Sequence, residues 1–211
     1  MESARLLSVG HSNLDLDRFL ALLQGNGVTA LADVRSSPYS RRLPHFNRGV
    51  LEGELPARDI FYTFLGDLLG GRPTSPDLYD EEGRVVYERV RATMAFRLGL
   101  EKLMQGTEEH RIVMLCSEED PLDCHRGLMI TPALTEHGVA PLHLRKDGSL
   151  ETTAAMELRL LKETRLDVRL EPDLFWVPTE VERRRVVAEA YVVMGRKKSY
   201  RIQTDADDAD T

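Results

Sequence analysis

Short apolar runs alternate along the chain with segments of helical periodicity, and this alternation constrains the fold more than any other feature. The apolar runs lie at residues 6–9, 28–34, 60–65, 111–116 and 140–144. Apolar residues at helical spacing predict helices over 15–23, 87–104 and 126–136. Parallel strands need crossover connections of this kind, so we predict an α/β fold with an open, mainly parallel, doubly wound sheet of about five strands and helices on both faces.

The chain after residue 146 has a different pattern. Residues 151–162 and 180–194 predict two further helices, and Pro172 and Pro178 lie between them. We therefore expect three parts: an α/β domain over 1–146, a helical C-terminal extension without a core of its own over 147–203, and a disordered acidic tail over 204–211. Within the first part, the segment 87–104 predicts the longest helix, with Val90, Met94 and Leu98 on one face.

Charge and apolar content exclude several classes of protein. A formal net charge of -7 argues against nonspecific coating of nucleic acid, so any contact with nucleic acid must be local. No apolar run approaches the ~18 residues of a membrane span, and the N-terminal residues lack the apolar stretch of a signal peptide. The two cysteines suit a reducing compartment. We expect a cytoplasmic protein without a membrane partner.

Polar residues follow the predicted strands at the point where each strand ends. They are His11 and Ser12 after the first strand, Asp33, Arg35 and Ser36 after the second, Gly70, Gly71 and Arg72 after the third, and Cys116, Ser117 and Glu118 after the fourth. Ligands of open α/β sheets bind outside the carboxyl ends of the strands, because the connecting loops meet there. The sequence therefore predicts a functional site at this edge of the sheet.

The segment from Cys116 to Arg126 carries the strongest chemical signal. Cys124 precedes His125 and Arg126 at the start of a predicted helix, and both a helix N-terminus and nearby cations lower a thiol pKa well below about 8.5. Cys124 is therefore the predicted nucleophile and the more reactive thiol. Cys116 ends an apolar strand, which predicts a higher pKa. The alternative for both thiols is a packing role in the core.

The segment from Cys116 to Arg126 also has features of a phosphate-binding loop and of a metal site. A strand, cysteine, loop, arginine and helix in succession resemble the phosphate loop of cysteine-dependent phosphatases. The spacing from Cys116 to Arg126 is longer than in such loops, and the acidic residues 118–120 would repel phosphate, so this activity is disfavoured. Cys116, Cys124 and His125 could bind a metal, but no CxxC pair accompanies them, so no metal site is predicted. Reversible Cys116–Cys124 oxidation remains an alternative.

Positive charge and aromatic rings near the same edge indicate an anionic ligand. The predicted ligand-binding residues are Ser12, Arg35, Ser36, Arg41, Arg42, Phe46, Cys116, His125 and Arg126. Guanidinium groups suit phosphate or carboxylate, and Phe46 would allow a base to stack. His11, Asp33 and Glu118 join Cys124 as catalytic candidates. The alternatives are solvated arginines, a structural ion pair of Asp33, a hydrogen-bonded loop histidine and a core phenylalanine.

Several short motifs occur together in a fixed order. They are VGHS at 9–12, DVRS at 33–36, SRR at 40–42, HFN at 45–47, LGG at 69–71, and the segment from Cys116 through Pro121 to Arg126. In these motifs the chain resembles the bacterial family catalogued as domain of unknown function 488, over about residues 5–145. The resemblance implies a shared α/β domain with these polar segments as its signature. It implies no particular reaction.

These observations favour an enzyme that acts on an anionic, nucleotide-like or nucleic-acid-derived substrate. Its partner would be an anionic small molecule or a nucleic-acid fragment. Two alternatives remain open: a noncatalytic module that binds a nucleotide or a nucleic-acid end, and a cysteine-based redox or metal sensor. The reaction, the cofactor and the oligomeric state are not predicted by the sequence.

Overall fold

A mixed, mostly parallel sheet forms the centre of the molecule, in a computed structural model that describes residues 5–172 and 174–202. The sheet has six strands in the order β3-β2-β4-β1-β5-β6. The strands are β1 (Leu6–Gly10), β2 (Ala30–Asp33), β3 (Phe61–Phe64), β4 (Ile112–Cys116), β5 (Leu142–Leu144) and β6 (Leu150–Thr152). The first five pair in parallel and β6 is antiparallel to β5, which confirms the predicted fold class. The predicted tail, 204–211, lies outside the described residues.

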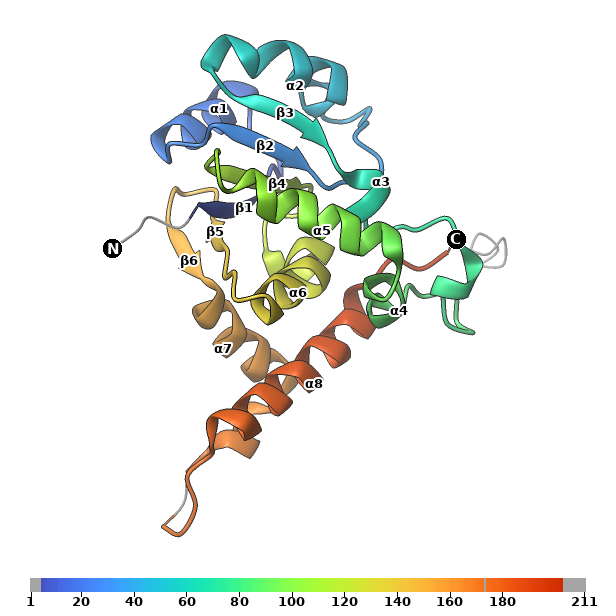
Figure 1. Cartoon of the computed structure of the whole chain (residues 1–211), viewed down its shortest axis with the longest axis vertical. Coiled ribbons are helices and arrows are strands. Elements are labelled where there is room, and N and C mark those ends of the chain that lie inside the picture. The colour runs from blue at the N-terminus through green and yellow to red at the C-terminus, as the bar shows by residue number, and fades with distance from the viewer. Residues whose placement is uncertain (1–4, 173, 203–211) are drawn as a thin grey trace.

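Helices cover both faces of the sheet (Figure 1). α1 (Leu16–Gly25) and α2 (Arg48–Glu54) pack on one face, and α5 (Met94–Gly106) and α6 (Thr131–Glu136) pack on the other. Successive residues of a strand point to opposite faces, so Val113 and Leu115 of β4 join the first core layer, and Met114 joins the second. This accounts for apolar runs without polar alternation in the central strands.

Two predicted elements differ from the structure. The segment 87–104 is not one helix, because α4 (Tyr87–Arg91) has its C-cap at Ala92, and Thr93 caps the N-terminus of α5 by accepting the Phe96 N–H at 3.1 Å. The break turns α5 about its axis, so that Met94 is 76% exposed and Phe96 is buried. The run at 60–65 does form a strand, but β3 lies at the sheet edge and Phe61 is exposed.

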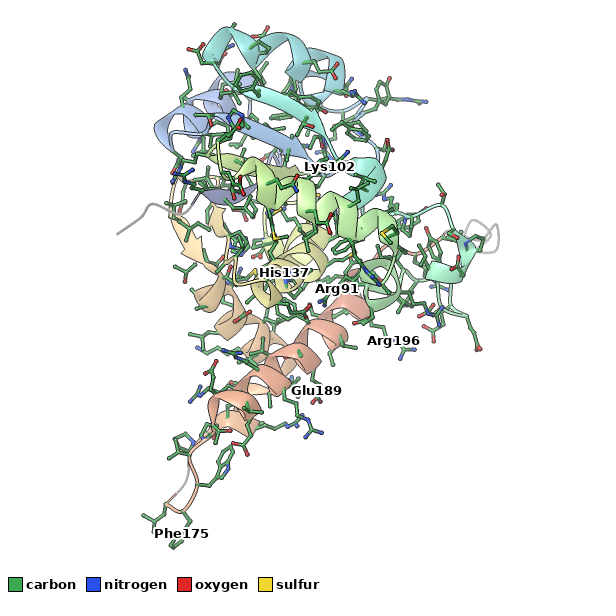
Figure 2. The ribbon with its side chains drawn as sticks, viewed as in Figure 1. Arg91, Lys102, His137, Phe175, Glu189 and Arg196 are labelled. Carbon is green, nitrogen blue, oxygen red and sulfur yellow. The ribbon has the colours of Figure 1, made fainter. Side chains whose placement is uncertain are left out.

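The C-terminal region shares the core of the sheet. Met156 of α7 (Thr153–Thr164) and Met194 of α8 (Glu180–Lys198) pack in the same layer as α5 and α6. The region also adds β6, which the predicted helical extension did not include. At its far end the arm of α7 and α8 projects from the sheet and carries the exposed Phe175 (Figure 2).

The longest described helix is α8 rather than the predicted 87–104 segment. Its N-terminus has a capping box, in which the Thr179 side chain and Glu182 satisfy each other's backbone N–H. The short helix α3 (Gly66–Leu69) follows β3 and leads to the glycine pair at 70–71. Over residues 5–172 and 174–202, none of the helices combines the length and the apolar content that a bilayer span requires.

Candidate functional site

A polar cavity of about 430 Å³ lies at the carboxyl end of the central strands. In the sheet, β4 lies between β1 and β2. The chain after β1 and β2 continues to α1 and α2 on one face, whereas the chain after β4 continues to α6 on the other face. The loops after these three strands therefore diverge and leave a crevice between them. The lining residues are His11, Ser12, Arg35, Ser36, Ser37, Tyr39, Ser40, Leu43, Gly71, Arg72, Tyr87, Cys116, Ser117, Glu118, Asp123, Cys124, His125, Lys198 and Tyr200. The cavity has the volume of a small-molecule site.

The loops after β1 and β4 are joined by backbone hydrogen bonds. The N–H of His11 donates to the Cys116 carbonyl at 3.0 Å, and the N–H of Ser12 donates to the Ser117 carbonyl at 2.8 Å. A Cβ atom at Gly10 would lie 1.6 Å from the Glu118 carbonyl oxygen, so only glycine allows this approach. Ser12 holds a left-handed φ of 47°, a conformation that costs about 1–3 kcal/mol and occurs often at functional sites.

Asp33 and Arg35 form a buried ion pair at the cavity, whose lining includes Arg35 but not Asp33. Asp33 is fully buried, and its carboxylate accepts Nε of Arg35 at 2.8 Å, Nη2 of Arg35 at 2.6 Å and the Tyr62 hydroxyl at 2.8 Å. Nη2 of Arg35 also donates to the Phe46 carbonyl. Asp33 does not line the cavity, so the structure does not place this predicted catalytic residue against a ligand. The structural ion pair, which the sequence left open, is the arrangement observed.

His11 lines the cavity and Phe46 lies beneath it. Their rings stack with centroids 4.3 Å apart, and Phe46 is fully buried, so it belongs to the core and not to a ligand-stacking surface as predicted. Burial and then the positive charge of Arg35 lower the pKa of His11 to about 4. The imidazole is therefore neutral near pH 7, with Nδ1 donating to the Ser12 carbonyl at 3.0 Å.

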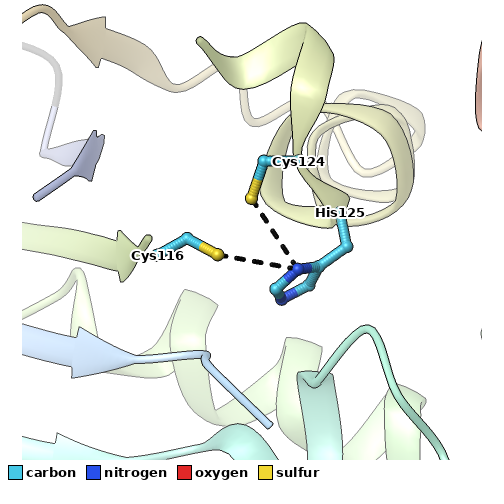
Figure 3. Close-up of side chains that lie close together, drawn as sticks. All are labelled: Cys116, Cys124 and His125. Carbon is cyan, nitrogen blue, oxygen red and sulfur yellow. Dashed lines mark hydrogen bonds between the residues drawn. The ribbon is translucent and has the colours of Figure 1, made fainter. Parts of the chain in front are cut away.

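Cys116, Cys124 and His125 meet at the base of the cavity (Figure 3). Cys116 ends β4, and the loop returns to place Cys124 and His125 at the start of the helical segment that contains α6. Nδ1 of His125 lies 3.7 Å from each sulfur, and the three atoms lie within 4.8 Å of one another. All three residues are buried and both cysteines are free thiols. This cluster could hold a metal ion.

The surroundings of the two thiols favour opposite protonation states. Burial raises the pKa of the Cys116 thiol, and the neighbouring Cys124 sulfur raises it further. Burial also opposes ionisation of Cys124, but the hydrogen bond from Cys116 and the positive charges of His125 and Arg126 outweigh it and lower the pKa of Cys124. These directions agree with the sequence-based expectation that the pKa of Cys124 is lower than that of Cys116.

Glu118 lies beside the cysteines and lines the cavity. Its carboxylate accepts the Cys116 thiol at 3.1 Å. Burial and then the charge of Cys124 raise the pKa of Glu118 above the ordinary range for this residue. A carboxyl group whose pKa moves toward neutrality is suited to proton transfer.

Arg126 shapes the loop and does not line the cavity. Its Nη1 and Nη2 donate to the carbonyls of Glu118 and Glu119 at 2.6 and 2.7 Å, and the side chain is buried. Both Nη atoms of this predicted ligand-binding residue are therefore engaged by the loop. The helical segment after it begins with a π-helical turn, Arg126–Ile130, a rare geometry that is frequent at functional sites.

A charged network holds the same loop against the C-terminal region. Arg159 of α7 donates to both carboxylate oxygens of Asp120, at 2.9 and 3.0 Å, and Arg145 donates to Glu119 at 2.9 Å. Glu151 accepts from both arginines. Because α7 holds Asp120 in this way, the C-terminal region helps to position the loop that carries both cysteines.

The cavity brings together most of the sequence-predicted residues and several that were not predicted. Its lining includes eight of them: His11, Ser12, Arg35, Ser36, Cys116, Glu118, Cys124 and His125. Arg41 and Arg42 are exposed and lie outside the lining. Sequence reasoning placed Arg72 at a strand end without naming it as a ligand-binding residue, and it missed Tyr87, Lys198 and Tyr200. Arg72 follows a glycine pair at a strand end, which was a usable signal, whereas the sequence of α8 gave none.

Arg72 and Lys198 add positive charge to the lining beside the predicted Arg35. The Arg72 guanidinium lies 4.6 Å from the Tyr200 ring centroid, and no carboxylate within residues 5–172 and 174–202 lies at ion-pair distance from it. Lys198 is paired with Asp123. Arg72 is therefore the lining cation best placed to meet an anion.

Comparison with known proteins identifies a family for the chain. No curated protein and no solved structure gave a significant match. Residues 15–131 match the model of one protein family, and this match covers more than half of the chain. The matched range contains β2, β3 and β4 and is shorter at both ends than the range of about 5–145 over which the motifs resemble the family. The chain belongs to the family described as domain of unknown function DUF488.

Proposed function

We propose that this protein is an enzyme that acts on a small anionic, nucleotide-like or nucleic-acid-derived substrate in the cavity at the carboxyl ends of β1, β2 and β4. The observation that carries the proposal is the position of the Cys124 sulfur. Its pKa is lowered by Cys116, His125 and Arg126 against the effect of burial, and it lies at the base of a cavity lined mostly by polar groups. Perturbed ionisable groups in a cavity are typical of catalytic sites.

The lining of the cavity supports the proposed substrate class. Arg72 lies at the cavity with its guanidinium free of carboxylates among the described residues, and it suits a phosphate or a carboxylate. Tyr39 is 66% exposed and also lines the cavity, so its ring is accessible to a base. Hydroxyl groups of Ser12, Ser36 and Ser37 add hydrogen-bonding capacity for a ribose or a phosphate.

Proton transfer is assigned to Glu118. It is the lining carboxyl group whose pKa is raised, and it contacts the Cys116 sulfur. His11 is neutral near pH 7 and serves as a hydrogen-bonding group for the substrate. Asp33 has no substrate-facing role in this proposal, since its carboxylate is enclosed by Arg35 and Tyr62.

Calorimetric titration with nucleoside mono- and diphosphates and with inorganic phosphate tests the substrate class. We expect Arg72→Gln to weaken binding about tenfold or more, because a hydrogen bond to a charged group contributes about 1.5–3 kcal/mol. Arg41→Gln is the matched control, an exposed arginine outside the lining, and it should bind as the wild type does. Equal binding by Arg72→Gln and the wild type would remove Arg72 from the site.

Product analysis of the bound ligand separates an enzyme from a binding module. The wild type should convert a ligand from the panel, and Cys124→Ser should bind it without converting it. A wild-type protein that binds the ligand and returns it unchanged would support the noncatalytic module and contradict the proposal.

A further inference from the structure

The cluster at the base of the cavity contains three atoms that could bind a metal, and the residues that supply them do not form a known metal-binding sequence motif. These atoms are the sulfurs of Cys116 and Cys124 and Nδ1 of His125. We propose that these three residues bind one soft divalent metal ion of the zinc class, with the fourth coordination position open to the cavity. The proposal rests on the proposed function only for the catalytic use of the metal, and metal binding itself stands on the geometry.

The distances between the donor atoms fit tetrahedral coordination. Zn–S bonds of about 2.3 Å and Zn–N bonds of about 2.0–2.1 Å at a tetrahedral angle separate sulfur from nitrogen by roughly 3.6 Å. Nδ1 of His125 lies 3.7 Å from each of the two sulfurs. The three side chains therefore need no rearrangement of the backbone to share one ion.

A hydrogen bond on the side of the ring away from the sulfurs fixes the orientation of the His125 imidazole. Nε2 of His125 donates to the Val34 carbonyl at 2.9 Å, so Nδ1 is the nitrogen that faces the sulfurs. A hydrogen bond of this kind to the second ring nitrogen is characteristic of metal-bound histidine. Gly71 packs against the ring, where an added Cβ would lie 2.8 Å from the His125 Cγ atom. Val34 and Gly71 together hold the ring so that Nδ1 of His125 can act as a ligand.

The charge of the cluster also suits a cation. Thiolate and imidazole ligands select zinc and other soft metals over magnesium or calcium. The Arg126 backbone N–H donates to the Cys124 sulfur at 3.4 Å, which stabilises negative charge on that atom. On binding, the ion replaces the proton of the Cys116 thiol and the proton on Nδ1 of His125, and these protons leave to solvent, while Cys124 binds as the thiolate that its surroundings favour.

Three protein ligands leave one position free, as in catalytic rather than structural zinc sites. Cys116, Cys124 and His125 all line the cavity, so the free position faces the bound substrate. Glu118 lines the cavity as well and contacts the Cys116 sulfur at 3.1 Å. A metal ion held here would supply a Lewis acid to a water or substrate group at the free position, and the Glu118 carboxylate lies beside the cluster. In this view Cys124 is a metal ligand, and metal-bound water or substrate is the reacting group.

Loading the full-length protein with cobalt tests the site directly. The protein is stripped of metal with a chelator under reducing conditions and titrated with Co²⁺, a spectroscopic substitute for Zn²⁺. We expect one equivalent to bind, with the intense visible bands of tetrahedral Co²⁺ and a thiolate-to-cobalt charge-transfer band. Zinc should displace the cobalt. A weak octahedral spectrum, more than one loosely bound equivalent, or no binding by the reduced protein would overturn the proposal.

Substitutions of the proposed ligands test whether the ion binds at these residues. Cys124→Ser and His125→Gln should each weaken Co²⁺ binding by more than about 100-fold, since loss of outer-shell contacts alone costs 10–100-fold. His11→Gln is the matched control, because His11 lines the same cavity outside the cluster, and it should bind one equivalent. The wild-type charge-transfer band reports thiolate ligation even if a variant fails to fold. An unchanged affinity in both ligand variants would contradict the assignment.

The two proposals fail in different ways. Titration of zinc-loaded and metal-free protein with the nucleotide panel distinguishes them. If the protein binds the anion but no metal, the metal site is wrong and the proposed substrate class stands. If it binds one zinc and no anion of the panel, the proposed function is wrong and the metal site stands.

Discussion

Two buried polar clusters lie at neighbouring strand ends, and they differ in how completely their groups are satisfied. At the end of β2, the Asp33 carboxylate accepts from Arg35 and Tyr62, and Arg35 donates onward to the Phe46 carbonyl. At the end of β4, Nδ1 of His125 lies 3.7 Å from the sulfurs of Cys116 and Cys124, and all three residues line the cavity. The first cluster is closed and the second is open toward a ligand.

This difference separates structural from chemical roles among similar residues. A closed cluster leaves no donor or acceptor for a substrate, and its removal leaves a buried charge without a partner. An open cluster keeps lone pairs that only a proton or a ligand can use. A charged residue at a strand end therefore indicates a site only when its partners leave part of it unsatisfied.

The largest expected effect is the loss of stability when the closed pair is broken. Arg35→Ala leaves the Asp33 carboxylate buried without its main partner, which should cost about 3–5 kcal/mol of unfolding free energy. Urea unfolding of the reduced, metal-free protein measures this. Arg184→Ala, which breaks an exposed pair with Glu180, is the control and should leave the midpoint unchanged. A loss below about 1 kcal/mol for Arg35→Ala would show that the pair is not structural.

A third buried polar group, His143, has only one of its two ring nitrogens hydrogen-bonded, and its effect can be measured as a pH dependence of stability. Its Nδ1 lies 2.8 Å from the Ser8 hydroxyl, whereas Nε2 has no hydrogen-bond partner among the described residues. Burial, followed by the charges of Arg126 and Arg145, lowers the pKa of His143 from 6.5 to about 3 in the folded protein. The unfolded chain binds the proton first, so stability should fall as the pH drops from about 6.5 toward 3, at up to about 1.4 kcal/mol per pH unit.

His143→Gln removes this titration and keeps a group that can pair with Ser8. Urea unfolding at several pH values between 7 and 4 should give a shallower acid dependence for the variant than for the wild type. His11 titrates in both proteins and cancels in the difference. Parallel curves for the two proteins would mean that His143 takes up its proton at the same pH in the folded and unfolded states, and would contradict the lowered pKa.

Gly71→Ala should affect the open cluster more than the fold. The added methyl group would lie 2.8 Å from the His125 ring and displace Nδ1 from the sulfurs. We expect Co²⁺ affinity to fall about 10–100-fold, as for changes in outer-shell contacts. Gly49→Ala, at a position with nothing within 4 Å, is the control and should keep wild-type affinity. Wild-type affinity in Gly71→Ala would show that the ring is not held at this point.

The smallest expected effect concerns the contact between α7 and the cysteine loop. Arg159 is about one-third exposed, so Arg159→Ala should cost no more than about 1 kcal/mol of stability. The variant frees Asp120, whose carboxylate also caps the Leu122 N–H at 2.9 Å. Hydrogen exchange should therefore quicken at the amides of Leu122 and Cys124. Unchanged exchange there would mean that the network does not hold the loop.

The sequence predicted the sheet and its edge because both depend on local patterns. Apolar runs and helical spacing are properties of neighbouring residues, and all five predicted strands are present in the structure. The pairing within the sheet, which places β4 between β1 and β2, follows from no local pattern. The sixth strand was missed because Leu150–Thr152 is short and mostly exposed.

The roles of individual site residues depended on partners distant in sequence. The closure of Asp33 requires Tyr62, which β3 supplies, and Lys198 reaches the cavity from the end of α8. The spacing from Cys116 to Cys124 matches no metal motif, because a strand end and a returning loop supply the ligands. Only the fold brings these three donor atoms together.

Anomalous diffraction at the zinc absorption edge, from crystals of the zinc-loaded protein, tests the contrast between the two clusters most directly. We predict one strong peak bonded to the sulfurs of Cys116 and Cys124 and to Nδ1 of His125, and no peak at Asp33 and Arg35. A peak at another position, or no peak in crystals of fully reduced protein soaked with zinc, would contradict the account of the open cluster.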